Sequence, residues 1–137
     1  MGATSFDVVL RRRVTRYKED AECKAFVNWL ALAYPQVYEL TYHIPNGGYR
    51  HVREASKFKA IGVKRGVPDF HIAYPTAKYH GLWIEMKAGK GKPSKEQREW
   101  LYRLKGAGYA AGVCWGWEQA KRVVERYLGT SGLHVTN

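Results

Sequence analysis

Three long stretches of the chain repeat hydrophobic residues with a helical period. The first runs from Glu19 to about Tyr34 and stops before Pro35, because proline lacks the amide hydrogen that a helix interior needs. Its hydrophobic stripe consists of Ala21, Ala25, Phe26, Trp29, Leu30 and Ala33. The second stretch runs from Ser94 to about Lys105, and the third covers residues 117–128. A shorter helix, ended by a glycine, is predicted over residues 52–61.

Four other segments have the composition of strands: residues 38–44, 69–74, 81–87 and 109–115. The second and third lie close together in the sequence, which favours an antiparallel hairpin. The fourth is apolar throughout and is expected to be buried on both faces. The resulting order, α-β-(α)-β-β-α-β-α, predicts an α/β fold in which helices flank one central mixed sheet.

The chain is expected to form a single domain, residues 1–137, with its core in about residues 19–128. Residues 1–18 are basic, and the two interpretations are a DNA-contacting arm and a solvated entry to the first helix. Their basic residues are Arg11, Arg12, Arg13, Arg16 and Lys18. The tail, residues 129–137, is expected to fray.

Composition narrows the choice of partner. With 23 Lys and Arg against 12 Asp and Glu, the formal charge is +11, which favours nucleic acid first and an anionic membrane second. No apolar run is long enough to span a bilayer and no secretory signal is present, so a cytoplasmic protein without a membrane partner is expected. Cys23 and Cys114 lack the spacing of a zinc site. No organic cofactor is expected.

The strongest chemical signal lies in Glu85 and Lys87. Two residues apart on a strand, they share one face at a separation of about 6.5–7 Å. Asp69 follows a Gly-Val-Pro turn at the start of the preceding strand. Asp69 and Glu85 can bind Mg²⁺ or Mn²⁺, with the Met86 backbone carbonyl as a third ligand. Lys87 can hold the attacking water or stabilise charge on a phosphate.

Two helical residues extend this group, each with an alternative interpretation. Glu22 lies on the hydrophobic stripe of the first helix, where it is either a metal ligand or an acid in the first helical turn that extends to solvent. Gln97 lies at the start of its helix and is the last residue of an S-x-x-Q capping box that Ser94 opens. It either closes that box or also serves the active site.

Basic residues flank the expected site and are predicted to bind DNA phosphates. They are Arg50, Lys64, Arg65, Lys90 and Lys92.

The order and spacing of these residues resemble the PD-(D/E)XK nucleases and, more narrowly, the VRR-NUC (virus-type replication-repair nuclease) domain. The resemblance rests on Glu22, Ile44-Pro45-Asn46-Gly47, Gly62…Gly66-Val67-Pro68-Asp69, Ile84-Glu85-Met86-Lys87 and Ser94…Gln97. It implies a restriction-endonuclease-like fold and divalent-metal cleavage of DNA. It also implies metal-site roles for Glu22, Asp69 and Glu85. Lys87 is implied to be catalytic, and Gln97 to belong to the active site.

Small stand-alone members of this family resemble Holliday-junction resolvases that act as homodimers. One small domain supplies one active site, so symmetric cleavage of a four-way junction favours a C₂ dimer. The expected function is therefore a Mg²⁺- or Mn²⁺-dependent endonuclease for four-way DNA junctions in a bacterial or phage-infected cell. The alternatives are a flap, single-strand or nicking nuclease of the same fold, and a non-catalytic basic DNA-binding protein.

Overall fold

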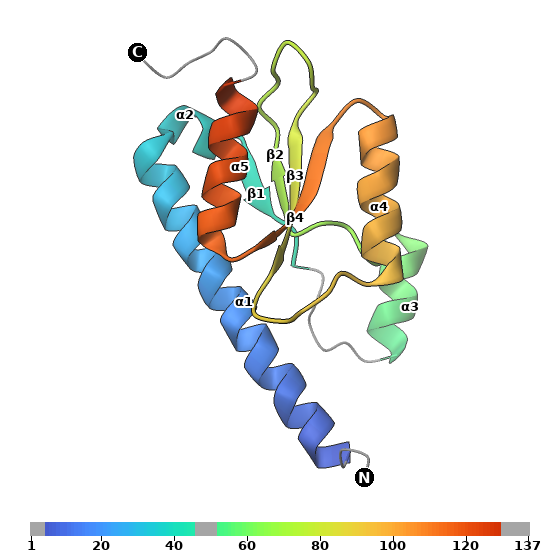
Figure 1. Cartoon of the computed structure of the whole chain (residues 1–137). Helices are drawn as coiled ribbons and strands as arrows, with labels where there is room; N and C mark the ends of the chain where they lie inside the picture. The colour runs from blue at the N-terminus through green and yellow to red at the C-terminus, as the bar shows by residue number, and fades with distance from the viewer. Residues whose placement is uncertain (1–4, 46–51, 130–137) are drawn as a thin grey trace.

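A four-stranded mixed sheet forms the centre of the molecule. The computed structural model describes residues 5–45 and 52–129 (Figure 1). The strands lie in sequence order: β1 (Thr41–His43), β2 (Phe70–Ile72), β3 (Leu82–Lys87) and β4 (Ala110–Trp115). β2 is antiparallel to both β1 and β3, whereas β3 and β4 are parallel. The predicted hairpin and the mixed sheet are both confirmed.

Helices cover both faces of this sheet. α1 (Ser5–Ala33) and α5 (Trp117–Gly129) lie on one face, and α4 (Lys95–Gly106) lies on the other (Figure 1). Two short helices, α2 (Pro35–Tyr38) and α3 (Val52–Ala60), connect the elements around β1. Among the described residues, no helix is both long enough and apolar enough to cross a bilayer.

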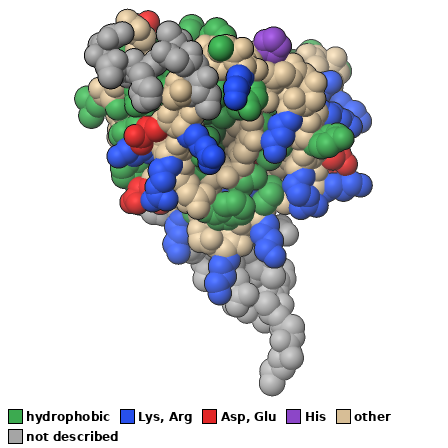
Figure 2. All heavy atoms as spheres, turned by 45° about the horizontal axis from the view of Figure 1, so that its top comes forward, with side chains coloured by type: hydrophobic (Ala, Val, Ile, Leu, Met, Phe, Trp, Pro, Cys, Tyr) green, Lys and Arg blue, Asp and Glu red, His purple; other side chains and the backbone are tan. Residues whose placement is uncertain are grey.

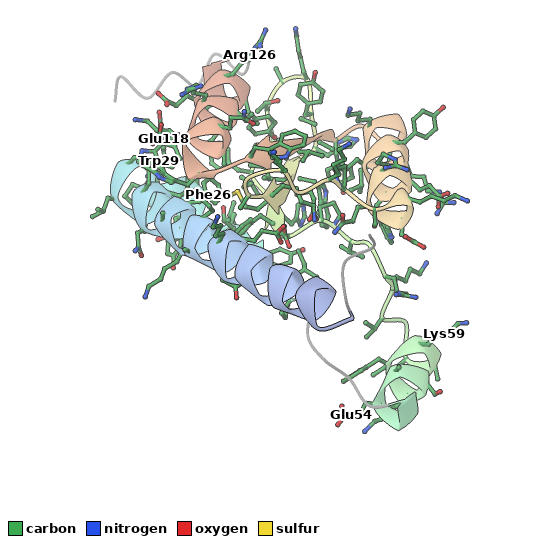
Figure 3. All side chains as sticks on the ribbon, turned by 60° about the horizontal axis from the view of Figure 1, so that its bottom comes forward. Phe26, Trp29, Glu54, Lys59, Glu118 and Arg126 are labelled. Carbon is green, nitrogen blue, oxygen red and sulfur yellow. The ribbon has the colours of Figure 1, made fainter. Side chains whose placement is uncertain are left out.

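The hydrophobic core lies between the sheet and the α1–α5 pair. Phe26 on α1 is fully buried (Figure 3). Its ring meets that of Phe70 of β2 edge-on, with ring centroids 5.1 Å apart. Each large apolar side chain buried in this way contributes about 1.5–3 kcal/mol. The other fully or nearly buried members include Leu30, Ile72, Leu82, Ile84, Met86, Cys114, Ala120, Val124 and Leu128. Alternate residues of β3 therefore point into this core, as its sequence pattern predicts.

The first helix is longer than the hydrophobic pattern predicts. It begins at Ser5 and not near Glu19, so most of the basic segment is helical. No glycine or proline interrupts the sequence from Ser5 to Ala33, and Arg, Lys and Leu favour the helix. The hydrophobic stripe indicates only where the helix packs, because a helix can continue beyond its buried face.

Two strands also differ from their predictions. β1 has three residues instead of the seven expected, because Pro35–Tyr38 forms a helical turn before it. β4 is not buried on both faces: Cys114 is buried, whereas its other residues are half-buried or exposed. Its position at the edge of the sheet leaves one side of the strand unpaired within the described chain, which explains the difference.

Candidate active site

β3 carries two charged residues on the sheet face that α4 partly covers. Glu85 is only 2% exposed, and its Oε2 lies 3.2 Å from Nζ of Lys87. Both side chains are buried although their strand neighbours Ile84 and Met86 belong to the core on the opposite face. The predicted alternation of β3 is thus confirmed. Burying two opposite charges is costly unless they have partners, so the ion pair needs the groups around it.

Asp69 supplies the second carboxylate. Phe70 pairs with Ile84 across β2 and β3, so the next residue pair along the two strands brings Asp69 opposite Glu85. Oδ2 of Asp69 accepts a 2.7 Å hydrogen bond from the backbone N–H of Met86. This bond holds the Asp69 side chain over β3. The backbone carbonyl of Met86 as a metal ligand stays a prediction.

The surroundings of Glu85 raise the pKa of its carboxyl group. Burial and the neighbouring Asp69 carboxylate together raise the pKa of Glu85 to about 8, against a smaller opposite effect of Lys87. Oε1 of Glu85 is buried and has no hydrogen-bond partner in the described part of the protein. A divalent cation would give that oxygen a partner and favour the charged form of Glu85. This orphaned oxygen fits a metal site.

The donor set also indicates which metal fits. Within residues 18–45 and 54–129, whose side chains the structure describes, no three His, Cys, Asp or Glu side chains converge on one metal position. Asp69 and Glu85 would therefore be the protein carboxylates of the site. Mg²⁺ typically uses one or two carboxylates and keeps several waters, whereas structural Zn²⁺ needs four protein ligands. The residues present fit Mg²⁺ or the similar Mn²⁺.

Gln97 makes contacts that fit both of the roles that the sequence left open. Its Oε1 accepts a hydrogen bond from the backbone N–H of Ser94 at 2.8 Å, and its own N–H donates to Ser94 Oγ at 3.1 Å. The capping box is therefore complete. The amide Nε2 of the same residue donates to Oε2 of Glu85 at 3.0 Å. Gln97 links the start of α4 to the buried carboxylate.

The loop before Asp69 is fitted closely to the start of α4. Gly66 has a φ of +83°, and a Cβ atom there would lie 2.7 Å from the backbone carbon of Glu96. Only glycine accommodates both this backbone conformation and the close approach. Gly66 therefore allows α4 to pack directly against the Asp69 loop.

Glu22 forms a hydrogen bond at the start of α5. Its Oε2 accepts a 2.6 Å hydrogen bond from the backbone N–H of Trp117, the first residue of α5. The N-terminus of a helix has unpaired N–H groups and attracts negative charge, so this contact ties α1 to α5. This contact does not fit the alternative of an acid extended into solvent, and the role of Glu22 as a metal ligand stays a prediction.

Glu19 is the α1 carboxylate on the side of the site. Its Oε1 lies 3.4 Å from where a Cβ of Gly91 would be, and Cδ of Lys87 lies 3.7 Å from the same point. Sequence reasoning missed Glu19 because it began the hydrophobic stripe at Ala21 and placed Glu22 on it beside Ala25, Phe26 and Trp29. The buried residue Phe26 and the core neighbour Cys23 are seven and four positions beyond Glu19, so the buried face extends back to it.

Cys23 lies among the acidic groups. Burial strongly raises the pKa of its thiol, and the negative charges of Asp69, Asp20, Glu19 and Glu85 add to this effect in that order. The thiol therefore stays protonated and is a poor nucleophile.

The predicted DNA-binding residues lie on loops around the site. Lys64 and Arg65 are exposed between α3 and β2, and the indole N–H of Trp100 donates to the Arg65 carbonyl at 2.9 Å. Lys90 and Lys92 are exposed in the loop between β3 and α4. Figure 2, which brings the top of Figure 1 forward, shows that lysine and arginine side chains are spread over that face as well, with few acidic side chains among them. Arg50 lies outside the described residues.

The comparisons with known proteins agree with this geometry. A model of the VRR-NUC domain matches residues 3–117. The chain belongs to the VRR-NUC family. A solved structure of a VRR_NUC domain protein is similar to this VRR-NUC chain, with a TM-score of 0.74 and 30% identity, covering 83% of this chain and 90% of that one. No curated protein matches the chain.

Membership of the VRR-NUC family confirms the predicted family and the PD-(D/E)XK-like fold. It also makes this chain a nuclease-type domain. The motif positions Asp69, Glu85 and Lys87 occupy one face of the sheet, where a nuclease site of this family is expected.

Proposed function

We propose that this VRR-NUC domain is a Mg²⁺- or Mn²⁺-dependent endonuclease that cleaves phosphodiester bonds in branched DNA. The observation that carries this proposal is that Asp69 lies beside the buried Glu85 and Lys87 on one face of the sheet. A non-catalytic DNA-binding protein would need the positive charge, but it would not need a buried carboxylate pair with an unpartnered oxygen.

Each residue has a separate task in this reaction. Asp69 and Glu85 would hold the cation, which supplies an activated water and neutralises charge on the phosphate. Lys87 reaches the same space, since Nζ lies 3.2 Å from Glu85, and its ammonium stabilises negative charge as the phosphodiester is attacked. Gln97 orients Glu85 through the amide hydrogen bond.

Four-way junctions are the first substrate to test. The exposed cations on both sides of the site, Lys64 and Arg65 on one loop and Lys90 and Lys92 on another, suit more than one DNA arm. A homodimer would supply the two sites that symmetric resolution needs.

A panel of substrates tests the proposal. Four-way junctions, flaps, single strands and plain duplex of matched sequence are incubated with Mg²⁺ or Mn²⁺, and the oligomeric state is measured by light scattering. We expect fastest cleavage of the junction by a dimer, with paired cuts in opposed strands. If the protein is a monomer and cleaves flaps or single strands much faster than junctions, the flap-nuclease interpretation replaces the resolvase interpretation. If no substrate is cleaved, the proposal that this protein is a nuclease is refuted.

A further inference from the structure

An exposed tyrosine lies beside the carboxylate pair on the same face of the sheet. Tyr42 of β1 is 52% exposed and pairs with His71 of β2, which in turn pairs with Trp83 of β3. These three residues form the row of the sheet next to the row of Asp69 and Glu85. Because diagonal neighbours on adjacent strands lie about 7–8 Å apart, the Tyr42 ring is within reach of the Asp69 position.

The ring of Tyr42 is held in place. Its hydroxyl oxygen lies 2.6 Å from Nδ1 of His71, in a hydrogen bond, and the two rings meet edge-on at 5.2 Å. The His71 ring is stacked on Trp83 with centroids 4.1 Å apart and planes at 8°. A side chain supported in this way loses less conformational freedom when a ligand packs on it than an ordinary exposed tyrosine does.

The helices leave this part of the face open in the described structure. α4 packs against β3 and β4, whereas β1 packs chiefly against β2 and α2. A DNA strand that reaches the carboxylates from the β1 side would therefore meet Tyr42. The surrounding charge is suited to such a strand, because Lys64 and Arg65 are exposed on the loop that leads into β2.

We infer that Tyr42 stacks on an unpaired nucleobase of the bound DNA, close to the cleaved phosphodiester. This inference rests on the proposed nuclease function and extends it to the recognition of the branch point, where bases are free to leave the helical stack. Stacking of a base on an aromatic ring does not depend on the identity of the base, so Tyr42 would recognise the unpaired state and not a sequence.

Three variants distinguish the contribution of the Tyr42 ring to DNA binding from that of its hydroxyl group and from the general effect of removing an exposed tyrosine. Tyr42→Leu removes the ring, and Tyr42→Phe keeps the ring but removes the hydrogen bond to His71. Tyr102→Leu is the matched control, since Tyr102 is 80% exposed on α4. Thermal unfolding of each variant establishes that it is folded.

Binding is measured in EDTA, so that it does not depend on cleavage. The ligands are a branched DNA with one unpaired 2-aminopurine at the branch, the same DNA with an abasic residue there, and a fully paired duplex. We expect Tyr42→Leu to weaken binding of the unpaired base about 5- to 150-fold, the loss of one stack, with little change for duplex. Tyr102→Leu should bind like the wild type. Tyr42→Phe should bind only slightly more weakly, because it loses the hydrogen bond to His71 but keeps the ring and its edge-on contact. Both variants should quench the 2-aminopurine fluorescence.

The abasic DNA gives a test that a folding defect cannot imitate. Wild-type protein should bind abasic DNA about as weakly as Tyr42→Leu binds the intact DNA, and combining both changes should cause no further loss. The inference would be overturned if the two losses were additive, if Tyr42→Leu kept the wild-type affinity, or if Tyr102→Leu lost as much affinity as Tyr42→Leu. In each of these cases, cleavage in Mg²⁺ would still support the proposed nuclease function. Stacking without cleavage in Mg²⁺ would instead refute the nuclease and retain Tyr42 as a nucleobase-binding residue.

Discussion

Gln97→Ala should lower stability and activity together, because one side chain serves the helix start and the site. The variant loses the Oε1 acceptor for Ser94 N–H and the Nε2 donor to Glu85, while the backbone bond to Ser94 Oγ persists. The lost cap costs on the order of 1 kcal/mol, and the hydrogen bond to Glu85, whose pKa is raised to about 8 in the metal-free protein, about 0.5–1.5 kcal/mol. The sum stays below the total stability of about 5–15 kcal/mol for a typical domain, so the variant should fold.

Activity should fall about 10- to 100-fold, as is usual when a partner of a metal-binding residue is removed. Ser94→Ala is the control, because it removes the other half of the capping box and leaves the Gln97–Glu85 contact intact. It should cost about 1 kcal/mol with activity retained. Gln97→Glu keeps the acceptor for Ser94 but replaces the donor with a carboxylate beside Glu85, so it should retain the cap and lose activity.

Chemical denaturation and single-turnover cleavage of branched DNA measure the two effects. If Gln97→Ala matched Ser94→Ala in stability and cleaved DNA at the wild-type rate, the contact with Glu85 would have no catalytic role.

Three further predictions follow from the site. Lys87→Ala should lower cleavage by about 100-fold or more while DNA affinity changes little, and a wild-type rate would remove Lys87 from the mechanism. Glu22→Gln should destabilise the protein by on the order of 1 kcal/mol and leave cleavage intact, whereas Glu19→Gln should impair cleavage more than stability. If Glu22→Gln impaired cleavage and Glu19→Gln only stability, Glu22 would belong to the site. Because burial and Asp69 raise the pKa of Glu85 from 4.5 to about 8, folded metal-free protein holds this proton more tightly than the unfolded chain. The free energy of unfolding should therefore fall by up to about 1.4 kcal/mol per pH unit between these values, and Glu85→Gln should remove this dependence, which denaturation at several pH values checks.

The positions of Glu85, Lys87 and Asp69 could be predicted because they depend on local geometry. Alternation along a strand sets the face of Glu85 and Lys87, and a hairpin between neighbouring strands brings Asp69 opposite them. These relations involve few residues and tolerate small errors in the strand boundaries.

The rotation of α1 could not be fixed in the same way. Several alanines widen its apolar face, so the sequence alone does not distinguish the turn that carries Glu19 from the one that carries Glu22. The packing of Phe26 against Phe70 decides the matter, and that contact joins distant parts of the chain.

The row that contains Tyr42, His71 and Trp83 was also beyond prediction. It depends on the register of β1 against β2, and these two strands are separated by a long connection that includes α3. A shift of one residue would turn Tyr42 to the opposite face.

Cleavage of branched DNA by the wild type and by Asp69→Asn, with Mg²⁺ and with EDTA, tests the central claim most directly. Asparagine retains an oxygen that can accept the Met86 N–H, so the variant should fold as the wild type does, which circular dichroism can verify. We predict that the wild type cleaves with Mg²⁺ and not in EDTA, that restoring Mg²⁺ restores cleavage, and that Asp69→Asn remains inactive throughout. Undiminished cleavage in EDTA, or by a folded Asp69→Asn protein, would contradict a metal-dependent site built on Asp69 and Glu85.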